Sequence, residues 1–236
     1  MFDSTRAHPR SGVPGKSVGF LAVAVMAAYV LYHNESFLLN AAHPVWEHYA
    51  PFKWWLLPHG LAGLAALVLA PMQFSERLRR RYTRLHRITG RFYVGCAFLL
   101  APLGAYIGYL DEAQGAPRAF TVMNATDGAL LMTTTGIGFF FALKRNIVQH
   151  RQWMTRSYAV ALVFFEARVI LGVTGWDAPP PDFATITSVV WVCLAFSLLI
   201  GDVANQLYEA RLRARSHRRE ASPLATSSLG EIKPAE

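Results

Sequence analysis

Residues Arg77–Leu110 read RLRRRYTRLHRITGRFYVGCAFLLAPLGAYIGYL, a basic stretch followed directly by an apolar run. Arg77–Arg91 holds seven arginines, and Phe92–Leu110 approaches the roughly 20 apolar residues that a helix needs to span a membrane. Lys and Arg next to an apolar span resist transfer across the membrane, so they mark its cytoplasmic side. The stretch therefore predicts a transmembrane helix that starts at the cytoplasmic face.

Composition extends this prediction to the whole chain of 236 residues. Apolar residues make up 53% of it and charged residues only 16%, and the mean hydropathy is positive, as is typical of membrane proteins. The net charge of +8 indicates no nucleic-acid partner, because the basic residues are confined to short segments between apolar runs. Cys96 and Cys193 both lie inside apolar runs, so they offer neither a disulfide framework nor metal-ligand spacing.

Six apolar segments along the chain predict an all-α bundle of six transmembrane helices. They are Val18–Tyr32, Trp54–Phe74, Phe92–Leu110, Thr121–Leu143, Tyr158–Gly175 and Ile186–Leu207. We expect a cytoplasmic segment over residues 1–17, the transmembrane domain over 18–208, and a basic tail over 209–236. The tail has few apolar residues to pack, which predicts disorder.

The distribution of Lys and Arg predicts the orientation of the bundle. Segments 1–17, 75–91, 144–156 and 208–236 carry 3, 7, 4 and 6 of these residues, whereas the alternate loops carry only Lys53 and Arg118. Both termini are therefore expected in the cytoplasm. The predicted location is the bacterial inner (plasma) membrane, with anionic headgroups at the cytoplasmic face as partners of the arginines.

Two histidines stand in matching positions, since His86-Arg87 and His150-Arg151 each precede a helix that runs outward, 64 residues apart. Other short motifs are PHG at Pro58–Gly60, APMQF ending at Phe74, LHRITGRFYV from Leu85 and HRQWMTRSYAVA from His150. Together with Arg168, these motifs resemble the bacterial family of predicted membrane proteins known as domain of unknown function 2306, over about residues 54–175.

This family resemblance implies a multi-pass membrane fold and no established activity, so no catalytic residue is assigned. The family pattern is recognisable at six polar or aromatic positions: His59, His86, His150, Trp153, Arg156 and Arg168.

LHRITGR also resembles, more distantly, the histidine-bearing helix starts of two-haem cytochrome b membrane reductases. This second resemblance implies a haem b held between His86 and His150, with a quinone as the electron partner. An outer pair is missing, because His59 has no histidine opposite it on the fourth segment. The sequence favours the alternative, in which His86 and His150 anchor helix ends at the interface.

Polar residues inside the apolar segments form a second candidate site. Asp127 and Arg168 lie at similar estimated depths on neighbouring segments, which predicts an ion pair. Further members of this intramembrane site are His59, Asn124 and Glu166. Such a site suits a small proton-linked transporter, although a structural ion pair that fixes helix register is nearly as well supported.

Three function classes remain open from the sequence: a haem redox protein, a proton-linked transporter, and a non-catalytic membrane protein. Phosphate-binding loops, nucleophile elbows and zinc-ligand spacings are absent from the sequence. Enzymatic activity is therefore undetermined, no metal site is expected, and a second copy of the chain is a further candidate partner.

Overall fold

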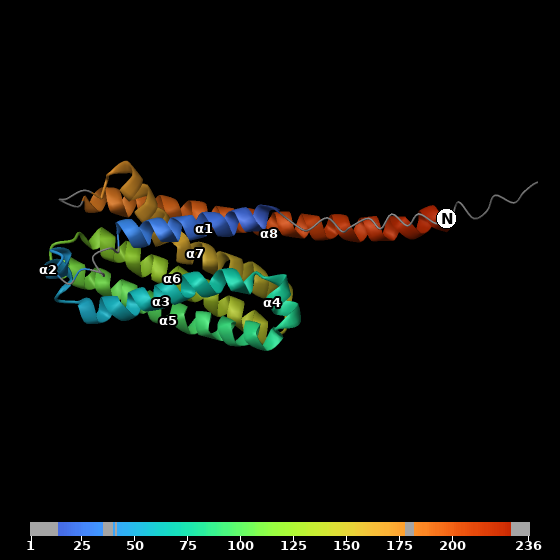
Figure 1. Ribbon diagram of the computed structural model, residues 1–236, viewed down its shortest axis with the longest axis horizontal. Coiled ribbons are helices and arrows are strands. Elements are labelled where there is room, and N and C mark those ends of the chain that lie inside the picture. The colour runs from blue at the N-terminus through green and yellow to red at the C-terminus, as the bar shows by residue number, and fades with distance from the viewer. Residues whose placement is uncertain (1–13, 35–39, 41, 178–181, 228–236) are drawn as a thin grey trace, which may run out of the picture.

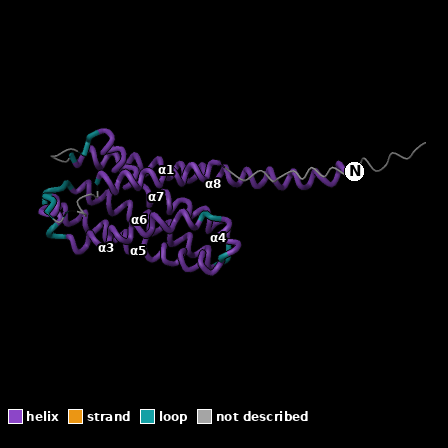
Figure 2. Tube along the Cα trace, in the orientation of Figure 1, coloured by secondary structure: helices purple, strands orange, loops and turns teal. Residues whose placement is uncertain are grey.

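The computed structural model describes residues 14–34, 40, 42–177 and 182–227, and every regular element within them is an α-helix. The helices are α1 (Pro14–His33), α2 (Val45–Tyr49), α3 (Lys53–Gln73), α4 (Glu76–Arg81), α5 (Thr83–Ala113), α6 (Arg118–Leu143), α7 (Ile147–Thr174) and α8 (Phe183–Ser227). Mostly short loops join them (Figure 2). The all-α prediction is confirmed for the described residues.

Five helices are long and apolar enough to cross a membrane, judged by length and composition. They are α3, α5, α6, α7 and the part of α8 over Phe183–Ala214. The sixth predicted span falls on α1, whose described apolar part, Val18–His33, is shorter than these. All six apolar segments of the sequence are thus helical, and five of them are established as candidate spans.

Four of the long helices form a bundle. α5 packs between α3 and α6, and α6 packs in turn against α7, while a smaller contact between α3 and α7 closes the ring. α5 and α7 therefore lie diagonally across the bundle. α8 packs on α7, and α1 also contacts α7, so that α1 and α8 lie on the same side of the molecule (Figure 1).

Glycines allow the closest helix contacts in this bundle. A Cβ on Gly128 of α6 would lie 3.0 Å from the Ala101 carbonyl oxygen of α5. A Cβ on Gly138 would lie 2.7 Å from Met154 Sδ of α7. Small residues of this kind let membrane helices approach closely, because helix association in lipid depends on packing.

Polar side chains mark where two of the helices begin. Ser75 precedes α4, and its hydroxyl accepts a hydrogen bond from the Leu78 amide at 3.3 Å. Before α8, the Asp182 carboxylate accepts hydrogen bonds from the Thr185 hydroxyl and the Ala184 amide. These bonds, the Thr185 bond first, hold the pKa of the Asp182 carboxyl below its ordinary value.

α8 is longer than the sequence analysis predicted, and it extends well past the bundle (Figure 1). The sequence predicted disorder from residue 209, whereas α8 is described as helix through Ser227; residues 228–236 lie outside the described residues. The apolar count misled because Ala, Arg, Leu and Glu dominate this stretch and favour helix without any packing. An ion pair one turn apart, Glu209 to Arg213 at 3.8 Å, also supports it.

Candidate functional site

One face of α6 is polar along most of the helix. Thr121, Asn124, Asp127 and Thr135 share this face because their spacings follow the helical period. Thr121 and Asn124 are half-buried, whereas Asp127 and Thr135 are buried. Since α6 packs between α5 and α7, this face points into the protein.

The face begins near the N-terminal end of α6 with hydrogen bonds to α5. The Thr121 hydroxyl lies 3.0 Å from the Gly108 carbonyl oxygen and 2.8 Å from Glu112 Oε2. One turn further, the Asn124 amide donates to the Phe120 carbonyl at 3.0 Å. It packs against Gly108, where a Cβ would lie only 2.8 Å from Asn124 Nδ2. The predicted site residue Asn124 is therefore part of the α5–α6 contact.

Asp127 is the carboxyl group on this face of α6. Its relative exposure is 5%, and its Oδ1 atom has no hydrogen-bond partner among the described residues. Met123 and Leu131, one turn away on either side, belong to the apolar core. Because an ionised carboxylate is expensive in such surroundings, the neutral acid is the form that suits them.

Asp127 Oδ1 has no hydrogen-bond partner among the described residues, so this oxygen does not bond Arg168. The ion pair between Asp127 and Arg168 stays a prediction. Similar depth on adjacent helices does not by itself bring two side chains together, because depth does not determine which way a side chain points around its helix. The other predicted carboxylate, Glu166, faces α8, where it accepts a hydrogen bond from the Ser197 hydroxyl at 2.6 Å.

His59 makes its own contact with α5. Its Nδ1 is 3.0 Å from the Leu100 carbonyl oxygen of α5. A carbonyl only accepts, so Nδ1 carries the proton and Nε2 is left without one in the neutral ring. A Cβ on Gly104 would lie 3.0 Å from His59 Cε1, so the ring fits against that glycine. Three of the predicted site residues thus lie in different helix contacts: Asn124 between α6 and α5, His59 between α3 and α5, and Glu166 between α7 and α8.

Sequence reasoning missed a chain of three hydroxyls at the centre of the bundle. The Ser157 hydroxyl on α7 is 2.6 Å from that of Thr135 on α6 and 2.8 Å from that of Tyr93 on α5. All three side chains are at most 1% exposed. Each hydroxyl both donates and accepts, so the chain is able to pass a proton along its hydrogen bonds.

His86 and His150 both lie at the basic end of the bundle, near the starts of α5 and α7. His150 Nδ1 donates to the Gly138 carbonyl oxygen at 2.8 Å, which leaves its Nε2 available. His86 Nδ1 is buried without a hydrogen-bond partner among the described residues.

These nitrogens would suit axial ligation of a haem, but the packing around them does not. A haem held on two sides needs a flat apolar slot between its ligands. One turn deeper than His150, Met154 fills the space beside Gly138, and Tyr93 bonds Ser157 across the bundle one turn beyond it. The residues present therefore do not fit a haem at this level.

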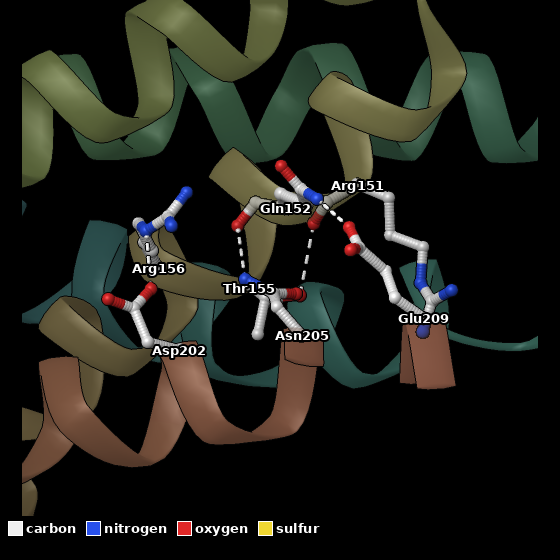
Figure 3. A network of polar contacts seen from close by, with 7 residues as sticks. All are labelled: Arg151, Gln152, Thr155, Arg156, Asp202, Asn205 and Glu209. Carbon is white, nitrogen blue, oxygen red and sulfur yellow. Dashed lines mark hydrogen bonds and ion pairs between the residues drawn. The ribbon is translucent and has the colours of Figure 1, made fainter. Parts of the chain in front are cut away.

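A polar network joins α7 to α8 near the same end (Figure 3). Arg156 Nε donates to Asp202 Oδ1 at 2.7 Å, and Asn205 donates to the Gln152 carbonyl oxygen at 3.1 Å. The Gln152 amide also donates to Glu209. Arg156 was singled out by the sequence motifs, and its observed role is to hold α8 against α7.

Comparisons with known proteins agree with the membrane architecture. The family model described as "Predicted membrane protein (DUF2306)" matches residues 56–204. No curated protein and no solved structure matches the chain. The first resemblance inferred from the sequence is thereby confirmed, while the resemblance to cytochrome b reductases gains no support.

Proposed function

The chain belongs to the DUF2306 family of predicted membrane proteins, and on that premise we propose that it is a small proton-linked transporter in which Asp127 binds the transported proton. The buried Asp127 carboxyl group, with Oδ1 unpartnered among the described residues, is the observation that carries this proposal. Ionisable residues inside membrane helices usually mark ion or proton pathways.

The polar face of α6 supplies a path on both sides of Asp127. Thr121 and Asn124 lie on the side of the α5–α6 loop, and Thr135 leads through Ser157 toward the His150 end. From Thr121 to Gly138, whose carbonyl binds His150, the helix rises about 26 Å at ~1.5 Å per residue, most of a membrane's apolar thickness.

The path is interrupted at Leu131, a buried apolar residue one turn beyond Asp127. An interruption next to the proton-binding group is what a carrier requires, because the site must open to one side of the membrane at a time. The proposal therefore describes a carrier rather than an open pore. The proposed path uses the hydroxyl chain and does not depend on an ion pair between Asp127 and Arg168.

The finer topology belongs to the same proposal. α1 acts as a sixth span, both termini lie in the cytoplasm, and the protein resides in a bacterial inner membrane. The excess of Lys and Arg in alternate segments supports this orientation, and so does the apolar run Val18–His33 in α1.

A b-type haem between His86 and His150 is the competing proposal. The free Nε2 of His150 and the unpartnered Nδ1 of His86 favour it. The side chains that fill the bundle interior leave no slot for the haem, so we place proton transport first.

Proton flux in liposomes tests the proposal. The purified chain is reconstituted with a pH-sensitive dye inside, and a potassium diffusion potential, negative inside, is imposed with valinomycin. Wild-type protein should acidify the lumen faster than protein-free liposomes do, and Asp127→Asn should return the rate to that background. Glu166→Gln is the matched control: it removes another membrane carboxylate but keeps an oxygen for Ser197, so flux should persist. Equal flux in wild type and Asp127→Asn, or none in wild type, overturns the proposal.

A further inference from the structure

A shallow groove runs along the outside of α5. Its volume is about 530 Å³, and its lining consists of Ile88, Arg91, Phe92, Gly95, Cys96 and Leu99. The groove is open at Gly95, where a Cβ would meet no atom within 4 Å. Phe92, Ile88 and Leu99 are 62%, 54% and 47% exposed, so they form apolar walls that the described residues leave largely uncovered.

The position of the groove indicates what covers it. α5 is one of the five candidate spans, and the groove opens away from the bundle interior, where Tyr93 and Ala97 lie on the opposite face of the helix. Apolar side chains exposed on the outside of a spanning helix meet lipid chains. From Arg91 to Leu99 the groove is about 12 Å long at ~1.5 Å per residue, which fits within one leaflet of the apolar core.

Arg91 gives the groove a charged end. Arg91 is the last residue of the basic stretch, directly before the apolar run, and its side chain is exposed. In the described part of the chain it makes no hydrogen bond or ion pair. A guanidinium group offers a planar set of donors that matches a phosphate group.

We propose that this groove binds one anionic phospholipid, whose acyl chain lies over Gly95 between Phe92 and Leu99 and whose phosphate contacts Arg91. The site faces away from the polar face of α6, so it does not depend on the proposed proton transport. Its ligand class follows from the juxtaposition of one guanidinium, unpaired among the described residues, with the apolar groove beside it.

Native mass spectrometry of the full chain in detergent tests this site, with dioleoylphosphatidylglycerol as the anionic probe and dioleoylphosphatidylcholine as the zwitterionic probe. Arg91→Gln should lower the affinity for the anionic lipid about fivefold, as expected for one interfacial charge, and Arg91→Lys should keep most of it. Arg80→Gln is the matched control, because Arg80 is an exposed arginine of the same basic stretch outside the groove.

Filling the groove separates the acyl-chain contact from the charge. Gly95→Leu should weaken the first binding event for both lipids, whereas Gly60→Leu, at another helical glycine with open space around it, should not. Circular dichroism and gel filtration confirm that each variant is folded. The proposal is wrong if Arg91→Gln and Arg80→Gln lose the same affinity, which would indicate general charge attraction, or if Gly95→Leu binds both lipids as the wild type does.

Discussion

Thr135 Oγ1 on α6 lies 2.6 Å from Ser157 Oγ on α7 at the centre of the bundle. Both side chains are fully buried, and Ser157 also bonds Tyr93 on α5, so one serine links three helices. Because these hydroxyls are buried, each depends on the others for its hydrogen bonds. The chain therefore both fixes the register of three helices and supplies the proposed proton path.

Ser157→Ala should destabilise the protein, because it leaves the hydroxyls of Tyr93 and Thr135 without their shared partner. We expect a loss of about 1 to 3 kcal/mol in the free energy of unfolding for each buried group left unsatisfied. Denaturant unfolding in detergent micelles measures it. Ser188→Ala is the control, since Ser188 is exposed and bonds only the Ala184 carbonyl of its own helix. Equal stability of the two variants would show that the hydrogen bonds of Ser157 contribute nothing to the free energy of unfolding.

The spacing of residues in the sequence contains a signal for the hydrogen bond between Tyr93 and Ser157. His86 and His150 are 64 residues apart, and so are Tyr93 and Ser157. α5 and α7 start at the same level and run in the same direction, so residues at equal distances from the two histidines lie at the same depth. A Ser hydroxyl in a helix is able to bond a carbonyl of its own preceding turn, so Ser157 by itself predicts no partner on another helix.

Apolar length predicted the helices well and the side-chain contacts poorly. Every apolar segment became a helix, because the run length reports directly on the membrane thickness. The contacts of Asp127 and Glu166 depend instead on rotation about α6 and α7, which depth along the helix leaves open. The rotation of each helix about its own axis is determined by close packing such as that of Gly128 on Ala101. A single glycine in the sequence does not indicate which residue of another helix it packs against.

The orientation of the bundle gives a second prediction. A phosphatase that is active only outside the cytoplasm should be active when fused after Gly115, in the α5–α6 loop, and inactive when fused after Arg145, in the α6–α7 loop. The reason is that α5 follows a stretch of seven arginines, which resists translocation. Activity measured in whole cells, normalised to the amount of fusion protein, decides the matter. The reverse pattern would invert the proposed topology.

The protonation of Asp127 gives a third prediction. Dicyclohexylcarbodiimide reacts with protonated carboxyl groups in apolar surroundings, and the Asp127 carboxyl is buried in the core. Labelling at Asp127 should therefore occur and should decrease as the pH is raised, because the neutral acid is the reactive form. Peptide mass spectrometry measures it. Glu166, whose carboxylate is bonded by Ser197, should be labelled less. An unlabelled Asp127 across the whole pH range would remove the basis of the proton-binding role.

The last prediction tests whether His86 and His150 bind a haem, which is the proposal that competes with proton transport. Purified protein, expressed with ample haem, should show no low-spin b-type band in a reduced-minus-oxidised spectrum, because Met154 and the Tyr93–Ser157 bond fill the interior beside His86 and His150.

Histidine variants make this test specific to the two candidate ligands. His86→Gln leaves every arginine of the basic stretch in place, so membrane insertion should be unchanged. His150→Gln keeps a side chain that is able to donate to the Gly138 carbonyl, so the α6–α7 contact should persist. Proton flux through both variants should then remain measurable, since neither change touches Asp127. A haem band in the wild type that each variant abolishes would instead establish axial ligation by His86 and His150, and would place the redox function ahead of proton transport.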